Sequence, residues 1–371
     1  MNFDFEYKLI VNENDEGKIK EYQMQEMFNV SITNKNILIF EPFPYHYECT
    51  SGFTKYFLDL GYKVDILMHE FGKDSLSLME EKDKIRIFIY ENLDQIHLFS
   101  KSLIAVMNYY AFILVETVTF SRNKTISELE LFSNNKSILV IHSMENYRLL
   151  NLSNVQNQNK IWTLGHFNIG LQVNPHHYGN IKIRDKNKRT KFFLVSTTSR
   201  NYKYIISAAY KIIAEKLEFE INVVGHQKTF SYQNKKKNKK VLKNRILYNY
   251  KTNYSTLYRM VNSSDYIIMC LDPDKDHEFK SERNSGTAQL AYGFLKPVLI
   301  NKYFKDNYNM TSENSFLFDK SSFYDTMKKA ILLNNKEYKK KQKKLLELKK
   351  NIYKISILNV QKTLNSLIKK L

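Results

Sequence analysis

Cysteine, proline, glycine and tryptophan are scarce in this chain of 371 residues, which has two cysteines, five prolines, ten glycines and one tryptophan. Two cysteines, Cys49 and Cys270, cannot build a disulfide framework, and we expect both to be inert thiols. So few glycines and prolines favour long helices and few elaborate loops. Hydrophobic residues make up 43% of the chain, enough for two domains that each bury a core.

The sequence also lacks a signal peptide pattern and a long apolar run. Residues 1–17 are acidic and show no basic stretch followed by an apolar one. The most apolar window, residues 103–118, is interrupted by Asn108 and Glu116 and is too short and too polar to span a bilayer. We therefore expect a cytoplasmic protein, or one bound peripherally to a membrane.

Acidic residues are fewer than basic residues in this chain. The 57 Lys and Arg outnumber the 38 Asp and Glu, which gives a formal net charge of +19 and favours polyanionic partners. A general richness in Lys, Asn, Ile and Tyr, as an AT-rich genome would produce, is the alternative explanation. The basic runs 182–191, 235–243 and 339–350 are either solvated faces or contacts to an anionic membrane surface. No nucleic-acid motif accompanies them, so we expect no nucleic-acid partner.

Apolar runs of strand length alternate with helical periodicity through most of the chain, which predicts parallel sheets covered on both faces. Strands are expected at residues 36–40, 63–68, 85–90, 111–117, 137–141, 160–164, 191–196, 220–224, 245–250, 265–271, 297–301 and 315–318. Helices are expected at residues 51–60, 93–108, 202–217, 255–262, 287–295, 322–334 and 336–371, with Ser255 and Ser322 as N-caps.

The repeated alternation predicts an α/β protein with two doubly wound Rossmann-like domains facing a cleft. We expect an N-terminal extension at 1–33, a first domain at 34–168, a linker or surface loop at 169–189, a second domain at 190–335 and a closing helix at 336–371.

The most informative stretch is Ser281 to Ile300, which follows an apolar strand and reads as loop, amphipathic helix and strand. Ligands of such sheets bind beyond the carboxyl ends of strands, and a helix start there offers free N–H groups to an anion. We expect the N–H groups of Ser285, Gly286 and Thr287 to bind a phosphorylated ligand beside Arg283. The alternative is an ordinary loop that ends at an N-cap.

The chain resembles the GT-B class of glycosyltransferases over most of residues 34–371. Many members have a Glu before this helix and a Pro-Val pair at the next strand, as at Glu282 and Pro297-Val298, and Ala291 also fits. The second acid and the Gly of that pattern are replaced by Leu290 and Leu295. The resemblance implies a nucleotide-sugar donor on the second domain, an acceptor on the first, chemistry without a bound metal, and a last helix that crosses back.

Further donor-binding and acid–base residues are expected at other strand ends. Glu282 to Thr287, including Asn284, with Gly225 and His226 would bind the donor, although Gly225 could instead serve a tight turn. In the loop 41–52, His46 is the favoured base and Glu48 the alternative or its orienting partner, unless the loop is only a surface turn.

His142 and His166 also follow strands and could contact acceptor or donor, or merely be hydrogen-bonded. The pair His176-His177 lacks further ligands at metal spacing, and the acidic stretch 272–276 lacks the Gly and Glu of a calcium loop. We expect no metal site and no cofactor.

We therefore predict a hexosyltransferase-type glycosyltransferase that moves a sugar from a nucleotide-diphosphate sugar to a glycan or lipid-linked acceptor, in surface polysaccharide synthesis. The alternatives are a nucleotide-sugar epimerase of the same fold and a non-catalytic nucleic-acid-binding protein.

Overall fold

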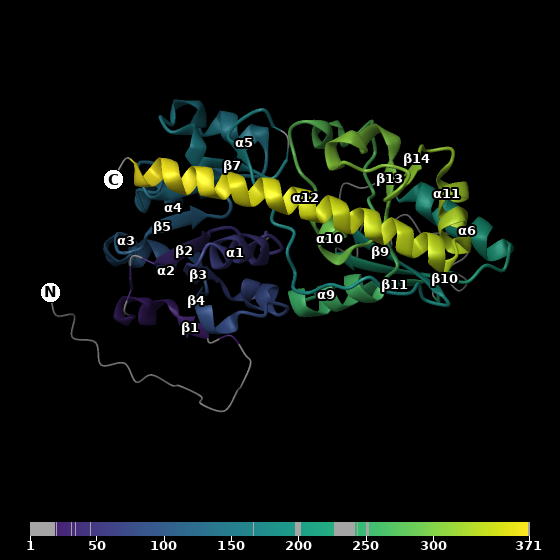
Figure 1. Ribbon diagram of the computed structural model, residues 1–371, viewed down its shortest axis with the longest axis horizontal. Helices are drawn as coiled ribbons and strands as arrows, with labels where there is room; N and C mark the ends of the chain where they lie inside the picture. Colours follow the sequence, from purple (N-terminus) through teal and green to yellow (C-terminus); the bar gives the residue numbers. More distant parts are fainter. Residues whose placement is uncertain are drawn as a thin grey trace.

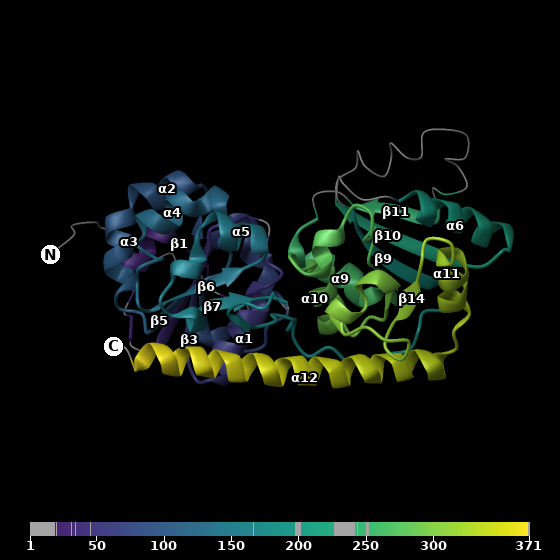
Figure 2. The same cartoon turned by 90° about the horizontal axis from the view of Figure 1, so that it is seen from above.

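The structure, a computed structural model, contains two α/β domains side by side, joined along one face by a single long helix (Figures 1 and 2). The predicted fold class, two doubly wound Rossmann-like domains, is confirmed. The structure describes residues 19, 21–30, 32–33, 35–44, 46–165, 167–196, 202–225, 242, 244–249 and 252–369.

The first domain is built on an eight-stranded sheet in the order β1-β4-β3-β2-β5-β6-β7-β8. All its pairings are parallel. The strands are β1 (Glu21–Gln23), β2 (Asn36–Glu41), β3 (Lys63–His69), β4 (Ile85–Tyr90), β5 (Phe112–Val115), β6 (Ser137–Ile141), β7 (Ile161–Thr163) and β8 (Leu171–Gln172). The helices are α1 (Thr50–Asp59), α2 (Leu93–Leu98), α3 (Ser100–Met107), α4 (Asn123–Glu128) and α5 (Met144–Leu149).

The second domain has a six-stranded parallel sheet in the order β11-β10-β9-β12-β13-β14. Its strands are β9 (Thr190–Ser196), β10 (Phe219–Gly225), β11 (Ile246–Asn249), β12 (Tyr266–Ile268), β13 (Val298–Asn301) and β14 (Phe316–Phe318). Its helices are α6 (Lys203–Ala214), α9 (Tyr254–Ser263), α10 (Gly286–Phe294) and α11 (Phe323–Leu332). In both sheets the strand order reverses at the centre, where doubly wound folds bind ligands.

The strands form where the sequence is continuously apolar, because both faces of each sheet are covered. Alternate side chains of β2 enter different cores: Ile37 and Ile39 pack with α1, whereas Leu38 and Phe40 pack with α2, α3 and α4.

Of the shorter elements, β1 was not predicted, because its three residues are polar. The predicted N-cap Ser255 is wrong: the Asn253 side chain accepts the capping bond from the Thr256 N–H.

The closing helix α12 (Asn335–Ile368) binds both domains (Figure 2). In its first half the Gln342 Nε2 donates to the carbonyl of Leu295 in the second domain, at 3.2 Å. In its second half Thr363 accepts from the Trp162 indole N–H at 2.7 Å, inside the first domain. In the described part of the chain, no helix is at once long and apolar enough to cross a bilayer.

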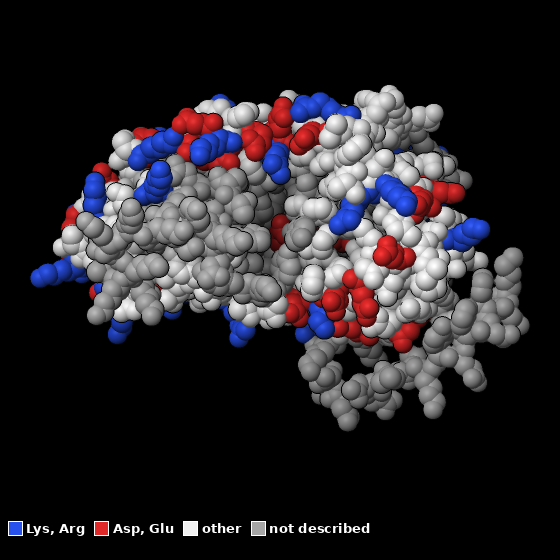
Figure 3. Space-filling model, turned by 180° about the vertical axis from the view of Figure 1, so that it is seen from behind, with Lys and Arg blue, Asp and Glu red and all other residues white. Residues whose placement is uncertain are grey.

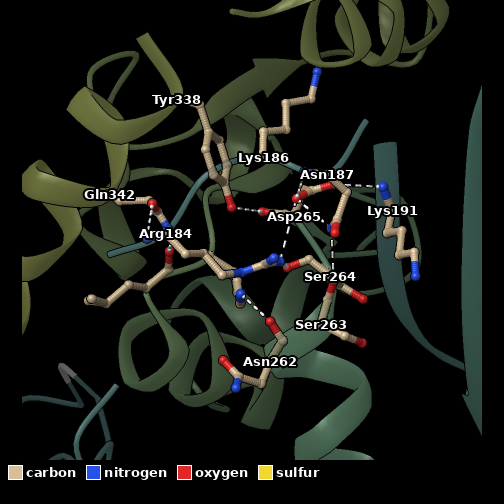
Figure 4. Close-up of polar contacts among 12 residues, drawn as sticks. Arg184, Lys186, Asn187, Lys191, Asn262, Ser263, Ser264, Asp265, Tyr338 and Gln342 are labelled. Atoms are coloured by element: carbon tan, nitrogen blue, oxygen red, sulfur yellow. Dashed lines mark hydrogen bonds and ion pairs between the residues drawn. The ribbon is translucent and has the colours of Figure 1, made fainter. Parts of the chain in front are cut away.

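The segment predicted as a linker or surface loop is buried in its middle part. Leu171 and Gln172 form β8, and most of residues 173–179 are buried between the domains and α12. Its end is held by Asp265, whose carboxylate accepts from the N–H groups of Asn187 and Lys191 at 3.0 and 2.8 Å and faces the Arg184 guanidinium (Figure 4). Tyr338 of α12 donates to the Asp265 carbonyl at 3.0 Å.

We predict that Asp265→Ala lowers the free energy of unfolding by about 3 kcal/mol, because it leaves the Arg184 charge without its carboxylate partner and two partly buried N–H groups without their acceptor. Urea denaturation measures the change. The matched control is Asp185→Ala, which removes a 64% exposed carboxylate that pairs with Lys339 and should change stability by less than about 0.5 kcal/mol. Equal effects of the two substitutions would contradict a structural role for the Asp265 network.

Candidate functional site

A cavity of about 620 Å³ lies between the domains, at the carboxyl ends of strands from both sheets. Ser143 and Leu164 line it from beyond β6 and β7, and Val195, Met269 and Leu271 line it from the ends of β9 and β12. Figure 3, seen from the face opposite α12, shows a crevice between the two domains. Its size fits a small-molecule ligand.

One wall of the cavity is the start of α10. Ser285 is the N-cap residue but its side chain makes no capping hydrogen bond, and Ser285, Gly286 and Thr287 all line the cavity. The first N–H groups of a helix have no acceptor within the helix, so they can donate to an anion. Arg283 also lines the cavity, where its half-exposed guanidinium lies 3.6 Å from Glu278 and over the Phe279 ring.

Gly286 brings α10 against the first domain. A Cβ at this position would lie 2.7 Å from the Glu48 Oε1, closer than real Cβ contacts. Gly286, which was predicted to bind the donor, therefore also permits the two walls of the cavity to approach each other closely.

The segment before α10 is bound to the first domain. Arg283 forms an isolated antiparallel bridge with Ser143, and the Met144 N–H donates to the Glu282 carbonyl at 2.8 Å. The Arg148 guanidinium pairs with the Glu282 carboxylate at 2.9 Å. Because of these contacts, Glu282, which was predicted to bind the donor, does not line the cavity.

Asn284 lines the cavity, and its amide donates to the Leu164 carbonyl at 3.1 Å. Both domains therefore contribute to the shape of the loop that leads into α10.

The opposite wall contains the predicted acid–base residues. His46, Glu48 and His142 all line the cavity. The His46 Nδ1 lies 3.6 Å from the Glu48 Oε1, within ion-pair range but longer than a hydrogen bond. The rings of His46 and His142 lie 4.2 Å apart, centroid to centroid. The hydroxyl of Tyr254, from the second domain, lies 3.5 Å from the Glu48 Oε2.

Two fully buried carboxyl groups lie behind this wall, Glu41 at the end of β2 and Glu116 after β5. Burial raises the pKa of both; repulsion from Glu41 raises that of Glu116 further, and repulsion from Glu48 raises that of Glu41. Thr117 donates to Glu41 at 2.5 Å, and Thr50 donates to both oxygens of Glu116 at 2.9 and 2.8 Å. A raised pKa favours the neutral carboxyl, which limits negative charge behind the cavity.

His142 is held in one tautomer. Its Nε2 lies 3.0 Å from the Glu116 carbonyl oxygen, which can only accept, so Nε2 carries the hydrogen. Burial, and then the nearby His46, lower the pKa of His142 well below its ordinary value. The neutral ring therefore keeps an unprotonated Nδ1 at the cavity wall.

Other predicted residues lie elsewhere. Gly225 ends β10 with a φ of 127°, a conformation that favours glycine, and it does not line the cavity. His166 and His226 lie outside the described residues. His176 is buried and its pKa falls to about 3, chiefly through burial. Among the residues that the structure describes, no group of three His, Cys, Asp or Glu could hold a metal ion.

Sequence reasoning missed Glu41, Glu116, Tyr254 and Gln289. Gln289, in α10, is fully buried and lines the cavity. Of these four, only Gln289 could have been identified from the sequence, because it is a polar residue on an otherwise apolar helix face. The other three depend on contacts between segments far apart in the sequence.

Solved structures share this architecture at low sequence identity. Alr3699/HepE from Anabaena in complex with UDP-glucose matches with a TM-score of 0.57 and 12% identity, over 91% of this chain and 100% of that one. The same protein in complex with UDP and glucose also gives 0.57 and 12%, over 90% and 100%. The chain has the GT-B fold.

A glycosyltransferase from Rickettsia africae ESF-5 matches with a TM-score of 0.49 and 13% identity, over 91% of this chain and 100% of that one. Comparisons with protein-family models and with curated protein sequences gave no match.

We predict that His142 stays neutral, with its hydrogen on Nε2, from pH 6.5, the ordinary pKa of histidine, to about pH 8, because burial and His46 disfavour the charged ring. Nitrogen-15 NMR of the imidazoles reports both the charge and the tautomer. A His142→Asn variant identifies the signal by its loss. A titration midpoint for His142 within this range would contradict the prediction.

Proposed function

We propose that the protein is a glycosyltransferase of hexosyltransferase type. In this proposal it transfers a sugar from a nucleoside-diphosphate sugar to a hydroxyl of a glycan or lipid-linked acceptor, in the synthesis of a surface polysaccharide. The observation that carries the proposal is the start of α10, which opens into the cavity opposite His46 and Glu48. The fold shared with a protein in complex with UDP-glucose supports it.

The donor half of the site would stabilise the leaving group. When the bond between the sugar's anomeric carbon and the β-phosphate oxygen breaks, the electron pair stays on the diphosphate. The N–H groups of Gly286 and Thr287 and the guanidinium of Arg283 can stabilise that charge. No bound metal is needed for this arrangement.

The acceptor half of the site would remove a proton. In the proposed reaction the acceptor oxygen forms the new bond to the anomeric carbon, and its proton passes to His46. Glu48, within ion-pair distance of the His46 Nδ1, would stabilise the imidazolium. The raised pKa values of Glu41 and Glu116 keep further negative charge from the approaching hydroxyl.

The rim of the cavity on the first domain carries two exposed apolar side chains. Leu149 lines the cavity while 53% exposed, and Phe120, between the lining residues Thr119 and Ser121, is 55% exposed. The Phe120 N–H donates to Asn146 at 3.0 Å, which holds the two residues on the same rim. Such a rim favours an acceptor with an apolar portion, such as a lipid-linked one.

The central test mixes the protein with nucleoside-diphosphate hexoses and lipid-linked acceptors and measures the release of the nucleoside diphosphate. We expect turnover by the wild type and a fall in kcat of about 100-fold or more for His46→Ala, with donor affinity kept, because a general base acts on the transition state. Conversion of the donor to its epimer without acceptor would replace the proposal with an epimerase. Unchanged kcat in His46→Ala would exclude this residue as the base.

For the rim we predict that Phe120→Ser combined with Leu149→Ser lowers kcat/KM for a lipid-linked acceptor about tenfold, since two apolar contacts are lost. Donor hydrolysis in the absence of acceptor should not change. The control is the same acceptor headgroup without its lipid, for which wild type and variant should be equal. An equal loss with both acceptors would contradict a lipid contact.

A further inference from the structure

Gln289 is a buried polar side chain without a partner. It is fully buried, and among the described residues neither its Oε1 nor its Nε2 has a hydrogen-bond partner. Its neighbours in α10, Ala288 and Leu290, are apolar. Buried amide groups are nearly always hydrogen-bonded, because an unpaired one costs free energy.

Gln289 lies close to the anion-binding start of α10. Gly286, Gln289 and Leu290 lie three and four residues apart, so they share one face of the helix, and all three line the cavity. Gln289 lies about one turn, or roughly 4.5 Å along the axis, beyond Gly286. That distance suits a group bonded to a phosphate that the helix start binds.

The chemistry of the amide restricts what can satisfy it. A carboxamide has an acceptor oxygen and a donor nitrogen and carries no charge. A phosphate oxygen could only accept, and would leave the Gln289 Oε1 unpaired. Two adjacent hydroxyl groups can both donate and accept, so they can satisfy both ends of the amide.

We propose that Gln289 binds a pair of adjacent hydroxyl groups of the nucleoside-diphosphate sugar. This assignment rests on the proposed function, from which it takes the donor. The phosphates bind at the helix start whatever they carry, whereas Gln289 selects the hydroxylated group attached to them. That group is either the ribose or the transferred sugar.

The test compares the wild type with Gln289→Leu, which replaces the amide by an apolar group of similar size. Gln342→Leu is the matched control: Gln342 is also fully buried in contact with the second domain, but its Oε1 accepts from Arg184 and its Nε2 donates to Leu295, each at 3.2 Å. We expect the melting temperature to stay or rise for Gln289→Leu and to fall by several degrees for Gln342→Leu, in the absence of ligand. A comparable fall in both would assign Gln289 a structural role and overturn the proposal.

Calorimetry then measures binding of UDP, GDP, ADP, CDP, their glucose conjugates and inorganic pyrophosphate. We expect Gln289→Leu to weaken binding of the preferred glucose conjugate about 10- to 30-fold, as for two lost hydrogen bonds, and to leave pyrophosphate binding within twofold. A loss already present with the free diphosphate, and absent with its 2′-deoxy form, identifies ribose. A loss seen only with the glucose conjugate identifies the transferred sugar.

The failures of the two proposals can be told apart. If the wild type binds no nucleoside diphosphate or conjugate, the proposed function fails, and the assignment of Gln289 fails with it. If the wild type binds and Gln289→Leu binds equally well, only the assignment of Gln289 fails.

Discussion

The contact between the segment 282–284 and the first domain governs the geometry of the site. The bridge from Ser143 to Arg283 and the bond from the Met144 N–H to the Glu282 carbonyl place the end of β6 beside the start of α10. Because α10 belongs to the second domain and β6 to the first, the cavity takes its shape only when the domains are together. The anion-binding wall and the acid–base wall therefore form as a single unit.

Much of the fold could be predicted from the sequence, since fully buried parallel strands read as continuous apolar runs. The strands β4 and β6 were predicted with the bounds that the structure shows, and α10 within one residue at each end. The short edge strand β1 is polar and gains its pairing from β4, so no local pattern marks it.

The residues that line the candidate site could be predicted where their positions depend on local chain geometry, and not where they depend on tertiary contacts. A helix start after a strand can be read directly, and so can a histidine at a strand end. The partner of Glu116 is Thr50, 66 residues away, and Tyr254 reaches Glu48 from the other domain. The donor role of Glu282 stays a prediction: its side chain pairs with Arg148 and does not line the cavity.

The helix α12 has a consequence for the route by which ligands enter. A continuous helix of 34 residues is stiff, and it is bonded to Leu295 in one domain and to Trp162 in the other. It lies on the face opposite the crevice of Figure 3. Because α12 crosses from one domain to the other (Figure 2), widening the crevice would require this stiff helix to bend, so α12 restricts the width of the opening through which donor and product pass.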